Sequence, residues 1–267
     1  MKCLSFFKSP LACAFLAALL CACSSTSMTS NRSALSPQQI SAIVANPNRN
    51  AADLKYDPSR KPQELLLFLG ASEGMVAVDL STGGGYTAEL LARAVGPSGK
   101  VYGQSTPRSP QSPPLPAGRL PSPETLAERS QRSSLGNLAS IVSPFSDPIP
   151  SAIQGQLDLI TLIFNYHDIT YANVDRNQMN QAILTALKPG GTYVIADYSG
   201  RPGTGISEGR TLHRIDESTV RKEVESVGFQ YIAEGGFLRN PSDPRDQKDV
   251  APPQTKDRFI VKFIKPL

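Results

Sequence analysis

An aspartate followed by a cluster of glycines is the feature of this chain with the clearest chemical meaning. Asp79 ends a short apolar, partly β-branched run at residues 75–78, and Gly83 and Gly85 lie in the turn that follows. Residues 86–95 then place apolar side chains on one stripe of a helix, so the glycines are expected between a buried strand and a helix. Glycine tolerates positive φ and has no Cβ, so a ligand can lie against bare backbone at the start of that helix. The pattern indicates a site for a nucleotide-type cofactor.

The chemistry of this loop favours a cationic ligand over a dinucleotide. The Gly-x-Gly-x-x-Ala spacing at residues 83–88 also satisfies the loose dinucleotide fingerprint. The carboxylate of Asp79, however, would repel a pyrophosphate, and it suits a ligand that bears an ammonium and a sulfonium group. A second turn, Lys-Pro-Gly-Gly at 188–191, follows a helical segment and precedes an apolar run at 192–196. Both details favour S-adenosylmethionine over NAD.

With these two turns the chain resembles the class I S-adenosylmethionine-dependent methyltransferases. Their acidic-x-Gly-x-Gly-x-Gly loop and Leu-Lys-Pro-Gly-Gly turn occur in the same order. Within that class, the chain looks like one group of predicted methyltransferases, and the resemblance covers about residues 51 to 266. The motifs that carry it are Arg-Lys-Pro at 60–62, Gly-Gly-Gly-Tyr at 83–86, Asn-Tyr-His-Asp at 165–168, Leu-His-Arg-Ile-Asp at 212–216, Asn-Pro-Ser-Asp-Pro-Arg at 240–245 and Asp-Arg-Phe at 257–259. The resemblance implies a fold and S-adenosylmethionine as cofactor, and it leaves the substrate open.

Alternating strand and helix patterns predict an α/β fold, a Rossmann-like doubly wound sheet of about seven strands with helices on both faces. The strands are mostly parallel, and the resemblance implies that the last one is antiparallel. A capping box at residues 36–39 opens the first helix, and Asp175 and Asp216 are expected to cap two later helices. After the strand before Asp79, we expect strands at 100–103, 139–142, 157–164, 192–197, 229–233 and 258–264.

Residues at the carboxyl ends of parallel strands are the candidates for ligand contact. Ser81 stands where the family pattern has its first glycine, and its hydroxyl could bond the carboxylate of the cofactor. Gln104 follows the second strand, where the family places an acid that binds both ribose hydroxyls. A glutamine can accept one hydroxyl and donate to another, but it lacks the charge-assisted bond, so weakened binding is expected.

The fourth strand ends in Asn165, Tyr166 and His167, where methyltransferases place residues that face the methyl group. Asn165 is therefore expected among the cofactor contacts. His167 could act as a base toward the nucleophile, and Tyr166 could line the sulfonium by a cation–π contact. In the alternative interpretation, His167 only holds loops in place by hydrogen bonds. Methyl transfer often needs only in-line positioning, so a base is not required.

The other histidine, His213, precedes Arg214 and the cap residue Asp216. Arg214 could receive an anionic substrate, although a structural salt link is the more favoured interpretation. The two histidines are 46 positions apart, and the chain outside residues 1–23 has no cysteine. No metal site is therefore expected.

The N-terminus predicts export with a lipid anchor. Lys2 and Lys8 precede or flank an apolar stretch at 11–20 that is too short to span a bilayer, and Leu-Cys-Ala-Cys follows at 20–23. This resembles the bacterial lipobox, which makes Cys23 the lipid-modified first residue of the mature protein. Ser24 behind it implies the outer membrane, facing the periplasm. We expect a signal peptide at 1–22, the lipidated Cys23 and a flexible tether at 23–35, and the folded domain at 36–267.

Composition limits the partners and the function. All four cysteines lie at or before Cys23, so the mature domain cannot form disulfides. The mature chain has 25 basic and 23 acidic residues, a formal charge of +2, and no footprint for nucleic acid. A segment at 105–123 contains seven prolines and is expected to be a surface loop, either solvated or binding a partner.

Three functions remain to be separated. The leading hypothesis is a lipid-anchored methyltransferase with a small-molecule substrate. The second is an exported ligand-binding module that retains the fold, because S-adenosylmethionine does not diffuse across the inner membrane. An NAD-dependent oxidoreductase is disfavoured by the carboxylate of Asp79.

Overall fold

A single seven-stranded sheet organises the chain. The computed structural model describes residue 1 and residues 33–107, 125–250 and 255–267. The strands are β1 (Val76–Leu80), β2 (Lys100–Ser105), β3 (Leu138–Val142), β4 (Leu157–Ile163), β5 (Leu187–Tyr198), β6 (Gln230–Glu234) and β7 (Arg258–Ile264). Their order across the sheet is β3-β2-β1-β4-β5-β7-β6. The pairs from β3 to β5 are parallel, and β7 is antiparallel to both of its neighbours. The predicted fold class is confirmed.

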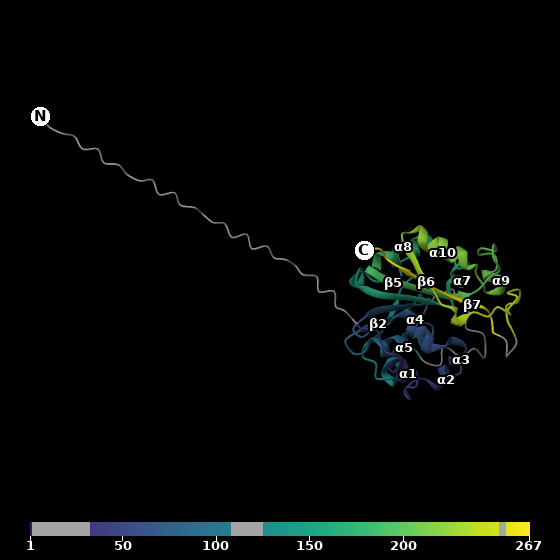
Figure 1. Cartoon of the computed structure of the whole chain (residues 1–267), viewed down its shortest axis with the longest axis horizontal. Helices are drawn as coiled ribbons and strands as arrows, with labels where there is room; N and C mark the ends of the chain where they lie inside the picture. Colours follow the sequence, from purple (N-terminus) through teal and green to yellow (C-terminus); the bar gives the residue numbers. More distant parts are fainter. Residues whose placement is uncertain (2–32, 108–124, 251–254) are drawn as a thin grey trace. The chain divides into compact units, whose positions relative to one another are not determined.

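Helices cover both faces of the sheet (Figure 1). One face carries α1 (Pro37–Val44), α4 (Pro62–Leu69), α5 (Tyr86–Val95) and α6 (Leu126–Arg132), whose apolar side chains pack with one core cluster. The other face carries α8 (Arg176–Ala186) and α10 (Glu217–Ser226), which pack with a second cluster. The short elements are α2 (Ala51–Leu54), α3 (Asp57–Arg60), α7 (Tyr166–Ile169), α9 (Gly209–Leu212), η1 (Ser151–Ile153) and η2 (Gly236–Leu238).

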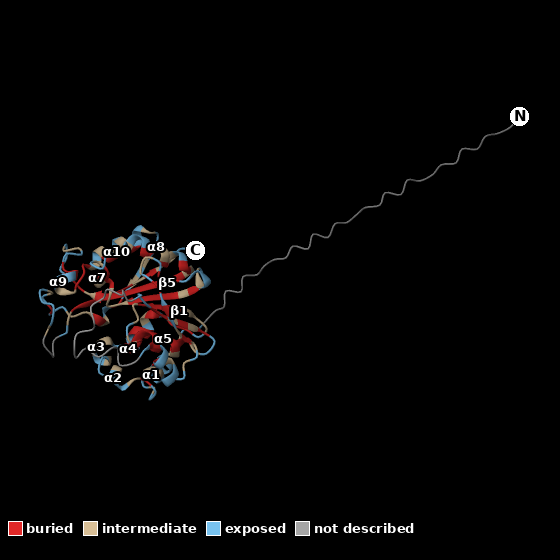
Figure 2. Ribbon diagram, turned by 180° about the vertical axis from the view of Figure 1, so that it is seen from behind, coloured by how far each residue is buried: buried red, intermediate tan, exposed pale blue. Residues whose placement is uncertain are grey.

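The strands are buried because successive side chains enter the two clusters in turn. Ala77 faces the first cluster and Val78 the second, and neither side chain is exposed to solvent. Figure 2 shows β1 and β5 as buried strands between the two helix layers. Apolar residues on both faces explain why these strands are continuous hydrophobic runs in the sequence. The central strands therefore form a rigid edge for the residues that follow them.

The predicted helix caps are present. Ser36 and Gln39 form the reciprocal bonds of a capping box at the start of α1. The carboxylates of Asp175 and Asp216 accept backbone N–H groups at the starts of α8 and α10. Arg214 is fully buried and forms a salt bridge with Asp243 at 2.8 Å, so the structural interpretation of this residue is confirmed.

Two differences from the expected elements have physical causes. Helix α6 was not anticipated, because it has little apolar periodicity; its local signal is the Thr125–Glu128 capping box. Buried Arg129 then anchors α6 through bonds to Asp53 and Glu89. Strand β5 begins five residues earlier than expected, at Leu187, because Leu157 of β4 pairs with it before a register shift.

Several predictions lie outside the described residues. These include the signal peptide, the lipidated Cys23 and most of the tether, along with nearly all of the proline-rich segment after residue 107. The boundaries at residues 22 and 35 stay predictions. Among the residues that the structure describes, no helix is long and apolar enough to cross a membrane.

Candidate active site

A cavity of about 500 Å³ lies at the carboxyl ends of β1, β4 and β5. Its volume is in the range that binds small molecules and cofactors, and its place is the edge where doubly wound sheets bind ligands. The strand ends contribute Asp79, Phe164, Asn165 and Tyr198. Ile163 at the end of β4 belongs to the same edge. The loop after β1, the start of α5, the N-terminal segment with α2 and α3, and α6 complete the lining with Ser81, Thr82, Gly83, Gly84, Tyr86, Thr87, Ala52, Asp53, Lys55, Tyr56, Arg60 and Arg129.

Asp79 places a buried carboxylate in this lining. Only 2% of the residue is exposed, and its oxygens accept hydrogen bonds from the hydroxyls of Thr161 at 2.7 Å and Thr82 at 2.8 Å. Burial raises the pKa of Asp79 to about 6, although the two hydroxyls and the positive charge of Arg60 oppose that rise. Among the described residues, no cation forms a salt bridge with this carboxylate. The site thus holds a costly negative charge that a cationic ligand would stabilise.

The three small residues of the loop differ in what their positions require. Ser81, Gly83 and Gly85 have φ values of 52°, 54° and 87°, so all three are left-handed. A Cβ on Gly83 would meet no atom within 4 Å, which leaves its backbone open toward the cavity. A Cβ on Gly85 would lie 2.6 Å from Leu126 of α6. Gly83 is therefore available to a ligand, whereas Gly85 is needed for packing and does not line the cavity.

Gln104 does not lie where the ribose contact was expected. It is fully buried and does not line the cavity. Its side-chain oxygen accepts the backbone N–H of Ser81 at 3.0 Å, and its side-chain nitrogen donates to the carbonyl of Ser143 at 2.6 Å. The amide therefore links the glycine loop to the segment after β3. Because Gln104 is buried away from the cavity, a ribose there cannot reach its amide, so the structure assigns Gln104 to loop support.

The residues at the end of β4 divide between the cavity and the core. Phe164 has a φ of 61°, a strained value for a bulky side chain, and its ring stacks on Tyr198 with centroids 5.2 Å apart. Asn165 lines the cavity as expected and donates to Asp168 at 3.0 Å. Tyr166 turns away: it is fully buried, and its hydroxyl donates to Glu223 at 2.8 Å. The aromatic role expected of Tyr166 is thus available to Phe164 and Tyr198 instead.

His167 lies behind Tyr198 and does not line the cavity. The residue is 2% exposed, and its ring meets that of Tyr198 edge-on at 5.7 Å between centroids. Its Nδ1 lies 2.7 Å from a carboxylate oxygen of Asp197. Burial lowers its pKa, but hydrogen bonds to Asp168 and Asp197 outweigh burial and raise the pKa to about 9. In this position His167 cannot contact a ligand in the cavity unless Tyr198 moves.

The two histidines lie side by side in space. Nε2 of His167 and Nδ1 of His213 are 3.3 Å apart, and Asp168 lies against both. The 46 positions between them in the sequence therefore do not keep the two histidines apart in the fold. Contact between α7 and α9 brings them together, and no local pattern indicates that contact.

Arg60 is a cavity residue to which sequence reasoning assigned no role. Its guanidinium lies over three aromatic rings, those of Tyr86 at 4.6 Å, Tyr56 at 5.4 Å and Phe164 at 5.6 Å from the centroids. These contacts hold the positive charge of Arg60 at the wall of the cavity that also contains the negative charge of Asp79. The only local signal was the Arg-Lys-Pro motif at 60–62. With Asp53, Lys55 and Arg129 also in its lining, the cavity thus offers both anionic and cationic groups to a zwitterionic ligand.

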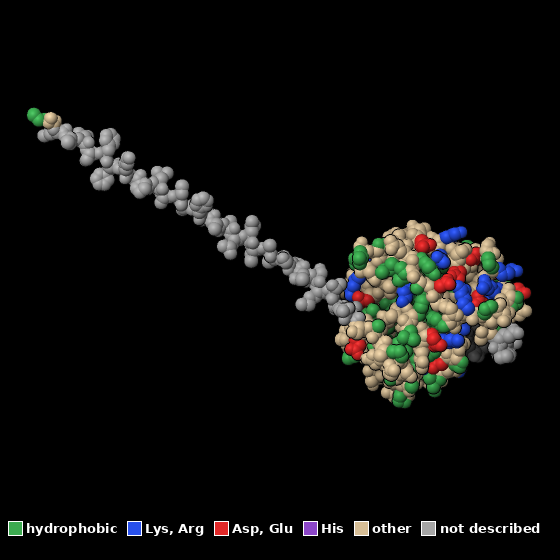
Figure 3. All heavy atoms as spheres, viewed as in Figure 1, with side chains coloured by type: hydrophobic (Ala, Val, Ile, Leu, Met, Phe, Trp, Pro, Cys, Tyr) green, Lys and Arg blue, Asp and Glu red, His purple; other side chains and the backbone are tan. Residues whose placement is uncertain are grey.

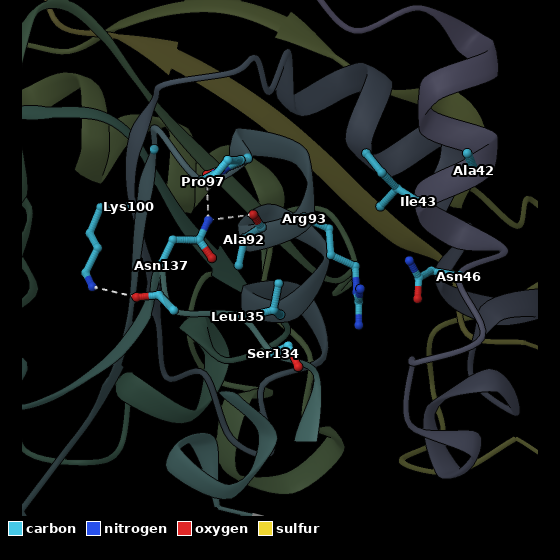
Figure 4. A pocket seen from close by; sticks show the side chains of 13 residues that line it. Ala42, Ile43, Asn46, Ala92, Arg93, Pro97, Lys100, Ser134, Leu135 and Asn137 are labelled. Atoms are coloured by element: carbon cyan, nitrogen blue, oxygen red, sulfur yellow. Dashed lines mark hydrogen bonds between the residues drawn. The ribbon is translucent and has the colours of Figure 1, made fainter. Parts of the chain in front are cut away.

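A larger cavity, of about 680 Å³, lies away from these residues near the start of β2 (Figure 4). Its polar groups already have protein partners. Asn137 donates to the carbonyls of Ala92 and Gly96, Lys100 bonds the carbonyl of Gly136, and Arg93 is paired with Glu89. It lies at the amino end of the strand, away from the edge used for ligands. Despite its size, this cavity is the weaker candidate for the cofactor site.

The surface shows no segregation of charge on the face drawn in Figure 3, where basic and acidic side chains intermingle. That distribution agrees with the small formal charge of the chain. A continuous basic stripe, which would attract a nucleic acid backbone, is not seen on this face.

The sheet order, the antiparallel β7 and the flanking helices define the Rossmann-like methyltransferase fold. No protein-family model matches the chain. Among solved structures, it is similar to a S-adenosylmethionine-dependent methyltransferase of Aquifex aeolicus, with 18% identity, a TM-score of 0.54, and coverage of 86% of this chain and 98% of that one. A chain from a Haloferax volcanii complex that contains the Trm112 methyltransferase activator matches with 16% identity, a TM-score of 0.55, and coverage of 87% and 100%. A S-adenosylmethionine-dependent methyltransferase of Mesorhizobium loti matches with 13% identity, a TM-score of 0.51, and coverage of 78% and 99%. These matches show the fold.

Proposed function

We propose that this protein is a S-adenosylmethionine-dependent methyltransferase with a small-molecule acceptor. The observation that carries the proposal is the buried carboxylate of Asp79, which has no salt-bridge partner among the described residues, beside the open backbone of Gly83. Such a carboxylate is costly, and a ligand that brings an ammonium group to it would recover that cost. A pyrophosphate would instead be repelled, which argues against NAD.

The residues of the cavity fit the cofactor. Asp79 would hold its ammonium group, and Arg60 or the hydroxyl of Ser81 would hold its carboxylate. The stacked rings of Phe164 and Tyr198 would form an apolar wall beside the cationic centre. Arg60 and Arg258 already lie over the Phe164 ring and Lys256 over the Tyr198 ring, so the rings would contact the ligand mainly by their edges. When bound, S-adenosylmethionine supplies an electrophilic methyl group on a sulfonium.

The protein's own contribution to the reaction is positioning. Phe164 is held in its left-handed conformation by a hydrogen bond from its N–H to the carbonyl of Ala196 at 2.7 Å, which fixes the ring against the cavity. A preformed wall orders the reacting groups before the reaction, which lowers its entropic cost. The lining offers no histidine to a ligand, so an acceptor that binds in its unprotonated form, such as a thiolate, a carboxylate or a neutral amine, fits this site best.

Calorimetry of the full chain with S-adenosylmethionine, S-adenosylhomocysteine and NAD tests the cofactor. We expect micromolar binding of the first two and no heat with NAD, and at least a tenfold loss of affinity in Asp79→Asn. Asp147→Asn, an exposed acid, is the matched control and should bind normally. Heat with NAD alone, or full affinity in Asp79→Asn, would refute the assignment.

A second candidate function is an exported binding module that keeps the fold for another ligand. The engagement of Gln104 with Ser81 and Ser143 favours it, because an amide already bound within the protein stands where the resemblance places an acid for the ribose. The two candidates differ in turnover. Release of S-adenosylhomocysteine during incubation with a small-molecule cell extract supports the enzyme, and binding without release supports the module.

We also propose that the protein is exported and held at the outer membrane by lipid on Cys23. The support is the sequence alone: the lipobox-like Leu-Cys-Ala-Cys at 20–23 after a short apolar stretch. Acyl chains add membrane affinity with each buried methylene group, so no further anchor is required. Labelling with palmitate in a bacterial host should mark the wild type and not Cys23→Ser, and Cys23→Ser should leave the membrane fraction. Equal labelling of both would refute the lipid anchor.

A further inference from the structure

Three metal-ligating side chains converge on one point beside the cofactor cavity. The atoms are Nε2 of His167, Nδ1 of His213 and one carboxylate oxygen of Asp168. The oxygen lies 3.2 Å from each ring nitrogen, and the nitrogens are 3.3 Å apart. The three atoms form a nearly equilateral triangle. The raised pKa of His167 keeps a proton on its ring at neutral pH in the empty site. A metal ion at this point would take the place of that proton, and all three atoms would then donate electron pairs to it.

We propose that His167, Asp168 and His213 form a binding site for a divalent transition-metal cation, with Zn²⁺ as the preferred ion. Two imidazoles and one carboxylate are a recognised ligand set for zinc with an open fourth position. Bonds of about 2.0–2.2 Å to a tetrahedral ion separate the ligand atoms by roughly 3.3–3.6 Å, whereas octahedral bonds of about 2.1 Å separate them by roughly 3.0 Å. The observed edges of 3.2–3.3 Å lie at the lower end of the tetrahedral range.

The surroundings of the triangle orient the ligands. Asp197, which is fully buried, lies 2.7 Å from Nδ1 of His167 and accepts the backbone N–H of the same residue at 2.7 Å. A proton on Nδ1 directed at this carboxylate leaves the lone pair of Nε2 facing the triangle. Tyr171 donates its hydroxyl to the ligating oxygen of Asp168. Carboxylates and hydroxyls behind the ligands are the usual means by which proteins fix a metal site.

The backbone holds His213 in place at a measurable cost. Its φ is 50°, a left-handed conformation that is uncommon outside glycine, although histidine is one of the residues enriched there, and His213 is the C-cap of α9. The preceding helix α9 packs on α7 through Gly209, where a Cβ would lie 2.4 Å from the hydroxyl of Thr170 and 3.0 Å from the carbonyl of His167. The close contact between α9 and α7, together with the left-handed backbone of His213, places the His213 ring at the triangle. Strained backbone maintained by tight packing is typical of functional sites.

The site is open on one side and separate from the cofactor cavity. The side chains of His213 and Asp168 are 31% and 36% exposed, whereas that of His167 is 3% exposed. A fourth ligand, water or part of a substrate, could therefore reach the ion from solvent. Tyr198 lies between, since its ring lines the cavity and contacts His167 edge-on. Within the described chain, no lysine or arginine forms a salt bridge with Asp168 or Asp197, so no basic side chain other than histidine occupies the place of a metal ion.

Titration of the full chain with Zn²⁺ and Co²⁺ tests the proposal. The protein is purified without a histidine tag, and its four cysteines are alkylated so that thiolates cannot bind the ion. We expect one equivalent of metal with micromolar or tighter affinity and the intense visible absorption of tetrahedral Co²⁺. His213→Asn, which keeps a residue that tolerates the left-handed conformation, and Asp168→Asn should each weaken binding by about 100-fold.

Controls separate loss of the site from loss of the fold. Asp147→Asn, an exposed acid away from the triangle, should bind like the wild type. Zn²⁺ should raise the melting temperature of the wild type and of Asp147→Asn, but not that of His213→Asn. Absence of stoichiometric binding, weak six-coordinate Co²⁺ absorption, or unchanged affinity in His213→Asn would each overturn the proposal. The triangle would then be a network of shared protons around Asp168.

Discussion

Replacement of Asp79 by asparagine should stabilise the protein at neutral pH and remove its cofactor affinity. The folded-state pKa of about 6 exceeds the ordinary value of 3.8, because burial penalises the charged form. The folded protein therefore holds this proton more tightly than the unfolded chain does. Stability from the protonated carboxyl is fully present below about pH 4 and is lost as the pH rises through about 6.

The size of the effect follows from the two pKa values. A difference of about two pKa units corresponds to about 3 kcal/mol, so ionised Asp79 lowers the free energy of unfolding at pH 8 by about that amount. An asparagine can bond both Thr82 and Thr161 without a charge. Asp79→Asn should thus raise the free energy of unfolding by about 2–3 kcal/mol at pH 8, and by less than about 0.5 kcal/mol at pH 4.

Urea denaturation of the wild type and Asp79→Asn at pH 4, 5, 6, 7 and 8 measures this difference. Asp147→Asn, in which an exposed acid is replaced, supplies the background pH dependence. The stability gap should open between pH 4 and 6 and then level off. A gap that is constant with pH, or an asparagine variant less stable than the wild type at pH 8, would show that Asp79 is not a strained buried charge.

Gln104→Glu should lower the free energy of unfolding by about 2–4 kcal/mol, because its new carboxylate would be buried against the backbone carbonyl of Ser143. It should not tighten cofactor binding. Urea denaturation at pH 8 measures the loss of stability, and unchanged stability would contradict the assigned bonds. Gly85→Ala should lose about 2 kcal/mol more stability than Gly83→Ala, since both positions have positive φ but only the Cβ at residue 85 meets α6. In calorimetry, Gly83→Ala should lose more cofactor affinity for a given loss of stability than Gly85→Ala. If the two variants lose equal stability and equal affinity, Gly83 is not the ligand residue and Gly85 the packing residue of this loop.

The sequence predicted the parts of this site that depend on local pattern. The strand-to-helix turn with its glycines, and the rule that ligands bind beyond the strand ends, placed Asp79, Ser81, Gly83 and Asn165 correctly at the cavity. The direction of a side chain beyond the last strand residue follows from its neighbours in space. Gln104 pairs with Ile141 of β3, and its side chain reaches Ser143 in the segment after β3. The sequence of β2 alone does not show this contact.

Other contacts depend on how distant elements pack. Tyr166 begins a single turn of helix, α7, whose orientation against α8 and α10 directs its hydroxyl to Glu223. The meeting of His167 with His213 requires α9 to lie on α7, and the only trace of that contact in the sequence is Gly209. Such a glycine has no local pattern to distinguish it from a loop residue. Periodicity and motif order thus predict the layers, whereas pairs that join separate helices need the structure.

The two departures from the family pattern, Ser81 and Gln104, are joined in the structure and should be coupled energetically. Ser81 is left-handed without being glycine, and its N–H donates to the side chain of Gln104. We infer that this bond holds a backbone that glycine would adopt unaided. Gln104→Leu should therefore cost less stability in the Ser81→Gly background than in the wild type.

A double-mutant cycle measures this coupling. The carbonyl of Ser143 loses its partner in both backgrounds, so that contribution cancels and only the link to the loop remains. A coupling of about 0.5–2 kcal/mol is expected, in the direction that Ser81→Gly softens the loss. Additivity within about 0.3 kcal/mol would mean that the bond does not maintain the strained turn, and the two departures would then be independent. A positive result would show that the Gln104 side chain keeps Ser81 in the geometry of a glycine turn, because that side chain bonds both Ser81 after β1 and Ser143 after β3. Asp79 and Gly83 would then be free to bind the ligand.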